Sequence, residues 1–358
     1  MRVVQIDGSY GEGGGQVLRT SLTLSALLGV EIEITRIRAG RSKPGLAAQH
    51  VTCVAAAAAV CGARVRGAEV GSQVVRFTPG AVRGGDYVFD VADVRPSAGS
   101  VSLVLQTVLP ALLYAAEPSR LTLRGGTNVP WSPPYEYLRD VFLPALACCG
   151  VRASIRRLRG GWYPAGGGEL SVAITPLEGP LRPFLMPQPG PLRRLTVTST
   201  VTAGLPEHIL KRQTAAALQA LPAELSRRAK RTQEQPEGGP GTCLCLALEY
   251  ERGYAGASAL GERGKPAEAV GKEAAGALTE YLAAAAAVDR HLADQLLLYA
   301  ALAEGESLIS GECSTRHLTT NAWVIHQFLG RRVTIEGESP VMIHVEGASL
   351  RAPGETPQ

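Results

Sequence analysis

Six residues near the N-terminus combine backbone freedom with one acidic group. Residues 11–16 read "GEGGGQ", with four glycines and Glu12 between a β-branched run and an apolar, helix-like run. Such a strand–glycine–helix junction exposes backbone N–H groups at a helix N-terminus, where anions bind. Glu12 would repel a phosphate unless a divalent cation lay between them, so the loop suggests phosphate with Mg²⁺ or Mn²⁺. The stretch matches neither GxxxxGK[ST] nor the dinucleotide fingerprint, and a tight turn with a solvated Glu12 is an equally good interpretation.

A cluster of basic residues follows the next strand-like run. The stretch "TRIRAGRSKPGLAAQH" contains four basic side chains within eight positions and no acid. Arginine suits two-pronged contacts with phosphate, so this segment is a second candidate for anion binding. A solvated basic loop is the alternative. The basic residues are Arg36, Arg38, Arg41 and Lys43; Gln49 and His50 end the stretch, and Arg19 is the basic residue that follows "GEGGG".

A histidine near the C-terminus is a candidate catalytic residue. His317 lies in "GECSTRHLTTNAWVIHQFL", beside Arg316 and small polar residues, where a helix is expected to begin. A neutral imidazole is available as a nucleophile near pH 7, without the deprotonation that a lysine needs. The position allows three interpretations: a helix-capping residue, a general base or a nucleophile.

Polar residues also interrupt runs that otherwise look like buried helices. Gln106 lies in "SAGSVSLVLQTVLPALL", and Asp294 and Gln295 lie in "DRHLADQLLLYAAL". Buried polar groups need partners, which makes these residues site candidates, although a structural role for Gln106 is equally compatible. In "GGTNVPWSPPYEYL", Trp131 and Pro133 could stack on a base or merely set a turn.

The elements that must position these residues follow a repeated pattern. At four places an apolar, helix-like run ends, one glycine follows, and a β-rich run begins. A glycine in the left-handed conformation commonly ends a helix and turns the chain into the next strand. Four copies predict an α/β fold of a few repeated units. The glycines are Gly29, Gly62, Gly150 and Gly330.

The long stretch between the third and fourth glycines predicts an inserted domain. It begins with the proline-rich segment 176–195, read as a linker, and continues with two strand-like and two helix-like runs. We therefore expect an inserted α/β domain at 183–286, and a parent domain at 1–182 and 287–358. The runs are the strands 193–201 and 242–251 and the helices 206–221 and 266–285.

Composition limits the classes of function. The 358 residues are 45% hydrophobic and 19% charged, as in ordinary globular proteins, and the net charge is +4. A charge this small permits nucleic acid as a partner but favours contact with an end over an extended duplex surface. The N-terminus has no signal-peptide core, and the apolar runs are short or interrupted, so we expect a cytosolic protein with no membrane partner. Seven cysteines without a CxxC pair predict reduced, mostly buried thiols.

Eight stretches together resemble the RNA 3′-terminal phosphate cyclase family. They follow the family's order from Asp7 to Asn321 and cover almost the whole chain. The resemblance implies a parent domain of repeated βαβαββ units interrupted by a smaller α/β insert. The stretches are "DGSYGEGGGQVLRT", "IRAGRSKPGLAAQH", "VRGGDYVFDV", "SAGSVSLVLQTVLPALL", "GGTNVPWSPP", "WYPAGGGEL", "HLADQLLL" and "STRHLTTN".

The resemblance also implies a reaction. His317 would attack the α-phosphate of ATP, form an AMP–histidine adduct and release pyrophosphate. AMP would pass to an RNA 3′-phosphate, and the neighbouring 2′-OH would displace it to give a 2′,3′-cyclic phosphate. The implied partners are ATP and RNA with a 3′-phosphate end, with Mg²⁺ or Mn²⁺ at Glu12; a homodimer is compatible.

The remaining site residues are assigned by the same resemblance. Pro133 would pack on one face of adenine with His291 opposite, although the family often has a tyrosine at that second position. Asp294 and Gln295 would contact the nucleotide or the metal. The residues expected around the phosphates are Arg19, Arg38, Arg41, Gln49 and His50, with Gln106 as a further contact.

Two other classes of protein compete with this interpretation. Cyclase-like proteins of ribosome assembly resemble the family but lack the active-site histidine, so His317 and the intact "GEGGG" argue against them. Enolpyruvyl transferases share similar repeated units but use no ATP. The basic run "SRRAKR" at 226–231 is read as a solvated helix end, with RNA contact as the alternative.

Overall fold

The first of three repeated units is formed by the N-terminal segment. The computed structural model describes residues 3–330 and 333–351. The unit has the element order βαβαββ, and its sheet has the strand order β1-β2-β4-β3, in which only β1 and β2 are parallel. Its elements are β1 (Val4–Asp7), α1 (Gly15–Leu28), β2 (Ile32–Thr35), α2 (Ala48–Cys61), β3 (Arg64–Arg66) and β4 (Val75–Thr78).

A second unit repeats this topology. Its sheet has the order β5-β6-β8-β7, again with one parallel pair followed by two antiparallel pairs. The second helical segment of this unit is broken into short pieces and includes a π-helical turn. Its elements are β5 (Gly85–Asp90), η1 (Val91–Asp93), α3 (Val101–Leu112), β6 (Ser119–Gly125), α4 (Tyr135–Tyr137), η2 (Leu138–Phe142), α5 (Leu143–Ala147), β7 (Arg152–Arg159) and β8 (Gly168–Thr175).

A third unit is interrupted after its first strand. Its sheet, β9-β14-β16-β15, has the same order and directions as the first two sheets. The short strand β9 and the helix α9 belong to this unit, but the insert separates them in the sequence. The elements of the unit are β9 (Leu185–Met186), α9 (Arg290–Leu302), β14 (Glu306–Gly311), α10 (Arg316–Leu329), β15 (Val333–Glu336) and β16 (Val341–Glu346).

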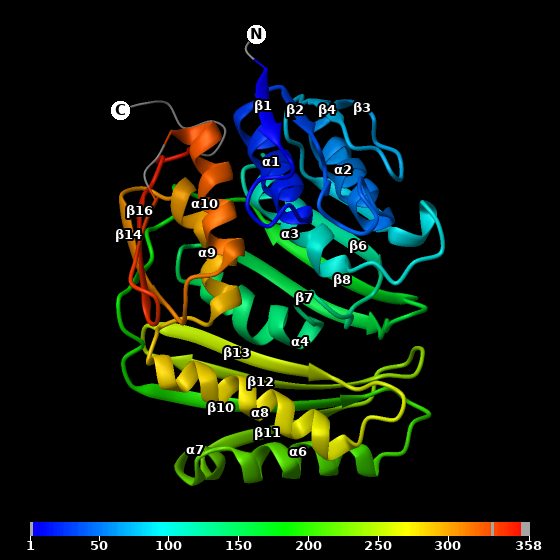
Figure 1. The fold of residues 1–358 in the computed structure, drawn as a ribbon, viewed down its shortest axis with the longest axis vertical. Coiled ribbons are helices and arrows are strands. Elements are labelled where there is room, and N and C mark those ends of the chain that lie inside the picture. Colours follow the sequence, from blue (N-terminus) through cyan, green and yellow to red (C-terminus); the bar gives the residue numbers. More distant parts are fainter. Residues whose placement is uncertain (1–2, 331–332, 352–358) are drawn as a thin grey trace.

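The insert forms a fourth sheet with a core of its own. Helices α6 and α8 pack against each other and against the sheet β11-β10-β12-β13, and a separate apolar cluster lies between them (Figure 1). The elements are β10 (Leu192–Val201), α6 (His208–Ala220), α7 (Ala223–Arg227), β11 (Ala229–Glu234), β12 (Thr242–Tyr250), β13 (Gly253–Leu260) and α8 (Ala267–Ala284).

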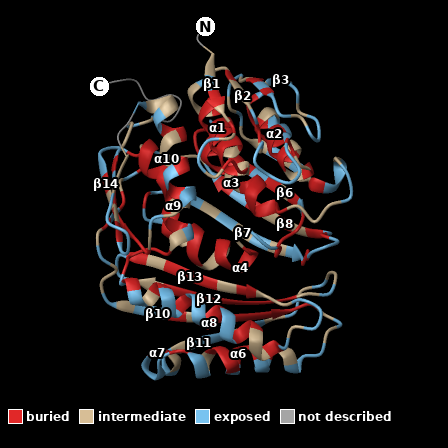
Figure 2. Ribbon diagram, in the orientation of Figure 1, coloured by how far each residue is buried: buried red, intermediate tan, exposed pale blue. Residues whose placement is uncertain are grey.

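The helices of the three units meet in one core. Helix α1 contacts α2, α3 and α10, and α10 contacts α9, so buried side chains of all three units form one cluster. In Figure 2 most of α1 and α3 is coloured as buried. Segments from distant parts of the chain, the start of α1 and the start of α10, are thereby brought side by side. The fold is α/β, as expected.

The helix-ending glycines behave as the sequence indicates. Gly29, Gly62 and Gly330 each follow a helix with φ between 57° and 65°, the left-handed conformation that glycine tolerates. Gly150, after α5, also has a positive φ of 104°. The strands and helices expected inside the insert are present as β10, β12, α6 and α8.

Two expectations about loops are wrong. The proline-rich segment 176–195 is no free linker, because it contains β9 and buries Leu181 and Phe184 in the main core. The run at 226–231 is a helix end only as far as Arg227, and Lys230 and Arg231 belong to β11. Since β9 pairs with β14, we propose that the insert begins after β9 and not at residue 183.

Candidate active site

The position of His317 is fixed by the start of α10. Thr315 caps this helix, and its hydroxyl accepts a hydrogen bond from the backbone N–H of Leu318 at 3.1 Å. His317 therefore lies in the first turn, where the helix dipole favours a negative ligand. Its imidazole is 50% exposed, which leaves it accessible to a substrate.

One face of the His317 ring is held by two residues behind it. Gln16 Oε1 lies 2.6 Å from His317 Nδ1, and the Gln16 amide nitrogen donates to a carboxylate oxygen of Asp294. Because that nitrogen is committed to Asp294, the amide presents its oxygen to the ring. An oxygen can only accept, so Nδ1 carries the proton and Nε2 is left as the nitrogen that can attack.

The chain of hydrogen bonds from His317 through Gln16 to Asp294 is called the relay below. Asn321 holds the Asp294 carboxylate in place. Its side-chain nitrogen lies 3.1 Å from both the backbone oxygen and Oδ1 of Asp294, and its own oxygen accepts from Thr20 at 2.8 Å. Asn321 is one turn after His317 on α10, whereas Thr20 is one turn after Gln16 on α1. The two helices are thus joined directly behind the ring. Burial raises the pKa of Asp294, which the neighbouring His317 and Gln16 oppose.

The other ring nitrogen faces Glu12. Nε2 of His317 lies 2.9 Å from Glu12 Oε2, and the second Glu12 oxygen accepts from Arg41. The contact with Glu12 raises the pKa of His317 above its ordinary 6.5, although burial opposes the shift; the same contact lowers the pKa of Glu12. The Glu12–His317 contact is an ion pair when the ring is protonated, and Glu12 Oε2 accepts no other hydrogen bond from the described residues.

The glycines around Glu12 are required by close packing. A Cβ on Gly11 would lie 2.1 Å from Thr320 Oγ1, and one on Gly15 would lie 2.3 Å from His50 Nε2. Gly14 precedes the first residue of α1 and supplies no side-chain cap, so N–H groups at the start of this helix stay open to a ligand. The "GEGGG" loop therefore lets α10, His50 and an anion approach one helix terminus.

The basic groups near this terminus differ in charge. His50 is buried, and burial together with Arg19 and Arg38 lowers its pKa to about 3, so it is neutral at pH 7. Its Nδ1 accepts from the backbone N–H of Ala47 at 3.0 Å, which leaves the proton on Nε2, next to Gly15. A neutral His50 offers phosphate a hydrogen bond from Nε2 and no charge, and its place at the phosphates stays a prediction. Arg19 and Arg38 supply positive charge.

A cavity of about 60 Å³ with both polar and apolar walls lies beside Gln16 and Asp294. Its lining includes Arg19, Gln106, Asp294 and Gln295, from α1, α3 and α9. The side-chain nitrogen of Gln106 and the oxygen of Gln295 are buried without hydrogen-bond partners in the described part of the protein. Unpaired buried polar groups are costly, so these two atoms indicate a place for a ligand with both hydrogen-bond donors and acceptors.

Comparisons with known proteins decide the family. A sequence model of "RNA 3′-terminal phosphate cyclase" matches residues 10–335. The chain belongs to the RNA 3′-terminal phosphate cyclase family. A relative of that name from Methylococcus capsulatus is 47% identical over 98% of this chain and 99% of the relative. One from Pyrobaculum neutrophilum is 46% identical over 96% of this chain and 98% of the relative.

A comparison of folds gives a much weaker likeness. The enolpyruvyl transferase NikO from Streptomyces tendae has a TM-score of 0.39 and 13% identity, and the match covers 98% of this chain and 50% of that protein. A likeness of this degree carries no argument about function. The assignment to the cyclase family therefore depends on the sequence comparisons.

The structure brings most of the expected site residues of this cyclase family member together. Glu12, Arg41 and His317 are in direct contact, and Arg19, Gln106, Asp294 and Gln295 line the neighbouring cavity. Gln49 points its oxygen at the backbone N–H of Ser100, 3.1 Å away, at the start of α3. The backbone oxygen of Pro133 accepts from Ser102 at 2.6 Å, also on α3.

Some assignments in the family site stay predictions. His291 is exposed in the first turn of α9, one turn before Asp294 and Gln295. Adenine between Pro133 and His291 is untested. Asp294 is engaged by Gln16 and Asn321, which makes it a positioning residue for His317 as well as part of the cavity wall.

The residues around Glu12 fit a divalent cation only in one way. The described residues contain no group of three or more His, Cys, Asp or Glu side chains arranged to hold a metal. Mg²⁺, however, is often bound by one or two carboxylates with waters and substrate phosphates. Glu12 supplies such a carboxylate, and its Oε2 atom, buried without a hydrogen-bond donor, fits that role.

Sequence reasoning missed the residues that orient His317. Gln16, Asn321 and Thr20 are buried polar side chains with partners 278 to 301 positions away in the chain, and Asn321 also bonds Asp294, 27 positions away. Gln16 directly follows the glycines, and Asn321 directly follows "RHLTT", so polar residues in the first turns of two apolar helices were the available signal.

Proposed function

We propose that this protein converts an RNA 3′-phosphate end to a 2′,3′-cyclic phosphate with ATP, through an AMP–histidine intermediate at His317 and an RNA-pp-A anhydride. Membership of the cyclase family supports the reaction. The observation that carries the residue assignment is the Gln16–His317 contact, because it leaves Nε2 as the nucleophilic nitrogen. Inactive, cyclase-like relatives are the alternative, and His317 in this oriented state argues against them.

In the first step, Nε2 of His317 attacks the α-phosphorus of ATP. A nitrogen–phosphorus bond forms, the bond to the bridging oxygen breaks, and pyrophosphate leaves with its electron pair. Any proton on Nε2 must first depart, since an imidazolium has no lone pair to donate. Gln16 keeps Nδ1–H in place, so the positive charge that develops on the ring is shared with the relay to Asp294.

In the second step, an oxygen of the RNA 3′-phosphate attacks the adenylate phosphorus and displaces His317. The product is an RNA-pp-A anhydride, and the ring is neutral again. The 2′-OH of the terminal ribose then attacks the 3′-phosphorus, loses its proton and expels AMP. AMP is a far better leaving group than oxide, which explains why ATP is needed for a ring closure that transfers no phosphate.

The binding residues follow from the geometry. Arg19, Arg38 and Arg41 supply positive charge around the start of α1, and His50 donates a hydrogen bond there. Gln106 and Gln295 offer one donor and one acceptor for the nucleotide. A divalent cation, Mg²⁺ or Mn²⁺, would be held by Glu12 and the triphosphate, and would supply neutralisation of phosphate charge.

The location and assembly of the protein remain part of the proposal. None of the helices in residues 3–330 and 333–351 combines the length and apolar character that crossing a bilayer requires. All seven cysteines are unpaired, and five are buried, which is typical of a reducing compartment and supports the proposed cytosolic location. A homodimer stays a prediction.

Paired RNA substrates test this function. The wild-type protein is incubated with ATP, Mg²⁺ and a short RNA that ends in either a 3′-phosphate or a 3′-hydroxyl. We expect the RNA with a 3′-phosphate to become resistant to phosphatase, and to release phosphate only after its cyclic ester has been opened. The RNA with a 3′-hydroxyl should stay unchanged. Label transfer from ATP to the protein without any change in the 3′-phosphate RNA would contradict the proposal.

A further inference from the structure

Trp131 is a large aromatic side chain on the surface of the second unit. It is 97% exposed, although an indole is a large apolar group that folding normally buries. Its backbone has φ of 59°, a left-handed conformation that is costly for a residue other than glycine. Exposure and strain at the same residue are disadvantages for the free protein, so they point to a ligand that the indole meets.

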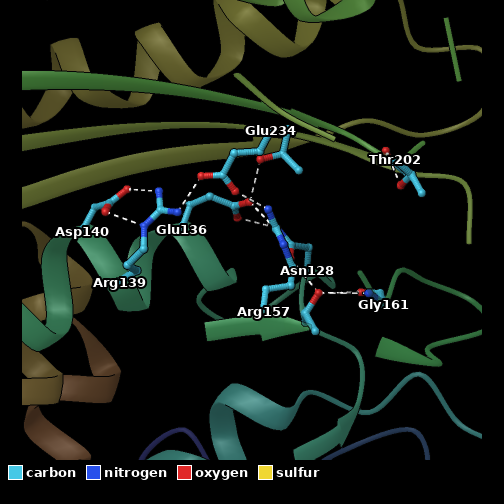
Figure 3. A network of polar contacts seen from close by, with 11 residues as sticks. Asn128, Glu136, Arg139, Asp140, Arg157, Gly161, Thr202 and Glu234 are labelled. Carbon is cyan, nitrogen blue, oxygen red and sulfur yellow. Dashed lines mark hydrogen bonds and ion pairs between the residues drawn. The ribbon is translucent and has the colours of Figure 1, made fainter. Parts of the chain in front are cut away.

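The loop that carries Trp131 is rigid. Its two ends are joined by a hydrogen bond from the Tyr135 N–H to the Thr127 oxygen at 3.1 Å, and the Ser132 hydroxyl donates to the Val129 oxygen at 3.0 Å. The side chain of Asn128 donates to the buried carboxylate of Glu136 at 2.6 Å (Figure 3). Trp131 is therefore presented by a preorganised turn, which lowers the entropy lost when a ligand binds.

A second exposed aromatic residue lies on the adjoining loop. Tyr163 is 70% exposed, and its loop begins at Gly161, whose oxygen accepts from the N–H groups of Thr127 and Asn128 at 2.9 and 3.0 Å. Figure 3 shows Asn128 and Gly161 close together. Two loops from different parts of the second unit thus place Trp131 and Tyr163 in the same region of the surface.

Both loops adjoin the candidate active site through α3. The Trp131 loop is fastened by Pro133 to Ser102, and Gln106, one turn further along α3, lines the nucleotide cavity. The Tyr163 loop packs closely on the segment that leads into α3, because a Cβ at Gly166 would lie 3.0 Å from the backbone oxygen of Ser97. Three residues later in that segment, the backbone N–H of Ser100 donates to Gln49. Two exposed arginines lie nearby in the sequence: Arg95 lies two residues before Ser97, and Arg159 lies two residues before Gly161.

We propose that Trp131 and Tyr163 form a stacking platform for the bases that precede the 3′-terminal nucleotide of single-stranded RNA. The inference deepens the proposed function and rests on it. Every base has a π-face, so stacking gives affinity without a strict sequence preference, and arginines near the platform suit the phosphate backbone. With a net charge of only +4, the protein attracts RNA weakly by electrostatics. Aromatic stacking would supply affinity of a different kind.

The test is a double-mutant cycle between the indole and a base. Affinity is measured without ATP, using short RNAs that end in a 3′-phosphate and contain either normal bases or one abasic site near that end. Trp131→Ala should weaken binding of the normal RNA by about 5- to 150-fold, the range for one stacked base. The abasic RNA should bind wild type as weakly as it binds Trp131→Ala, with no further loss on combining the two changes.

Controls separate this proposal from others. Trp131→Phe should recover most of the affinity, whereas Val88→Ala, at a 60% exposed site on β5, should bind like wild type. Labelling by ATP alone reports on the nucleotide site. Equal losses for normal and abasic RNA, loss of ATP labelling in Trp131→Ala, or a change of oligomeric state at unchanged RNA affinity would each overturn the stacking platform. Since binding is measured without ATP, a failed cyclisation reaction would not by itself affect this result.

Discussion

Gln16 Oε1 lies 2.6 Å from His317 Nδ1, although the two residues are 301 positions apart in the chain. The first turns of α1 and α10 therefore meet at one hydrogen bond. Behind Gln16, the carboxylate of Asp294 fixes which end of the amide faces the ring. The tautomer of the proposed nucleophile is thus set by a residue that does not touch it.

Asp294→Asn should impair adenylation through Gln16. A carboxylate only accepts hydrogen bonds, whereas an asparagine side chain can also donate one. The Gln16 amide can then turn its nitrogen toward Nδ1, which would move the ring proton to Nε2. We expect the single-turnover rate of adenylation to fall by about 10²- to 10⁴-fold, a range typical of losing an orienting partner or the correct tautomer. The ¹⁵N chemical shifts of His317 should show the change of tautomer. Asp93→Asn, at an exposed position, is the matched control, and an equal effect there would contradict the relay.

The pH dependence of His317 should follow Glu12. Because the contact raises the folded-state pKa above 6.5, the neutral ring becomes abundant only as pH rises through that higher value. By the same linkage, the ion pair stabilises the fold below pH 6.5 and this contribution is lost as pH rises through the folded pKa. Glu12→Gln removes the charge, so an NMR titration of the metal-free protein should show a lower pKa for His317.

Metal dependence provides the second part of that test. Mg²⁺ held by Glu12 and ATP should free Nε2, so raising Mg²⁺ should shift the adenylation profile of the wild type to lower pH. The Glu12→Gln variant should be less active and lack this shift. If both proteins have the same pKa and the same response to Mg²⁺, Glu12 belongs to a turn and not to the reaction.

His50 should make the fold sensitive to acid. Its folded-state pKa of about 3 lies below the ordinary 6.5, so the stability it supports is present above pH 6.5 and declines as pH falls toward 3. Each pH unit in that window costs about 1.4 kcal/mol for one group. Urea unfolding of His50→Gln should therefore depend less on pH between 7 and 5 than the wild type. The exposed His344 provides the control substitution, His344→Gln, for which wild-type dependence is expected.

A buried ion-pair network joins the second unit to the insert. The Glu136 and Arg157 side chains, 0% and 4% exposed, pair with each other, and Glu234 of β11 bridges Arg157 and Arg139 (Figure 3). Glu136→Ala leaves Arg157 buried with a weakened partner set, so we expect a loss of about 3–5 kcal/mol in the free energy of unfolding. Glu224→Ala removes an exposed pair and should cost at most about 1 kcal/mol. Equal costs would mean that the network is not stabilising.

Local signals in the sequence predicted the repeated units but not the segment that connects the second unit to the insert. The left-handed turn that ends a helix depends on the φ of one residue. Gly29, Gly62 and Gly330 could therefore be predicted from the residues next to them in the sequence. The strand β9 was missed because two residues in a proline-rich segment carry no periodicity, and only pairing with β14 reveals it. For the same reason the sequence suggested an insert that starts at residue 183, whereas we propose that it starts after β9.

The site shows the same division. His317 and Glu12 could be selected because their residue types suggest chemistry. The roles expected of the other site residues came from the family resemblance. The relay through Gln16, Asp294 and Asn321 requires that α1, α9 and α10 pack together, and no pattern within one helix encodes that packing. The charge state of His50 could not be predicted from the sequence, because burial, which the sequence does not display, determines it.

The most direct test of the account is the site of the AMP adduct. The wild-type protein is incubated with α-labelled ATP and Mg²⁺ in the absence of RNA, and the labelled peptide is mapped by mass spectrometry. We expect one acid-labile, base-stable adduct, on His317, and a loss of labelling by at least about 10³-fold in His317→Ala, as expected for a missing nucleophile. An adduct that persists in His317→Ala, or maps to His50 or His291, would contradict the account.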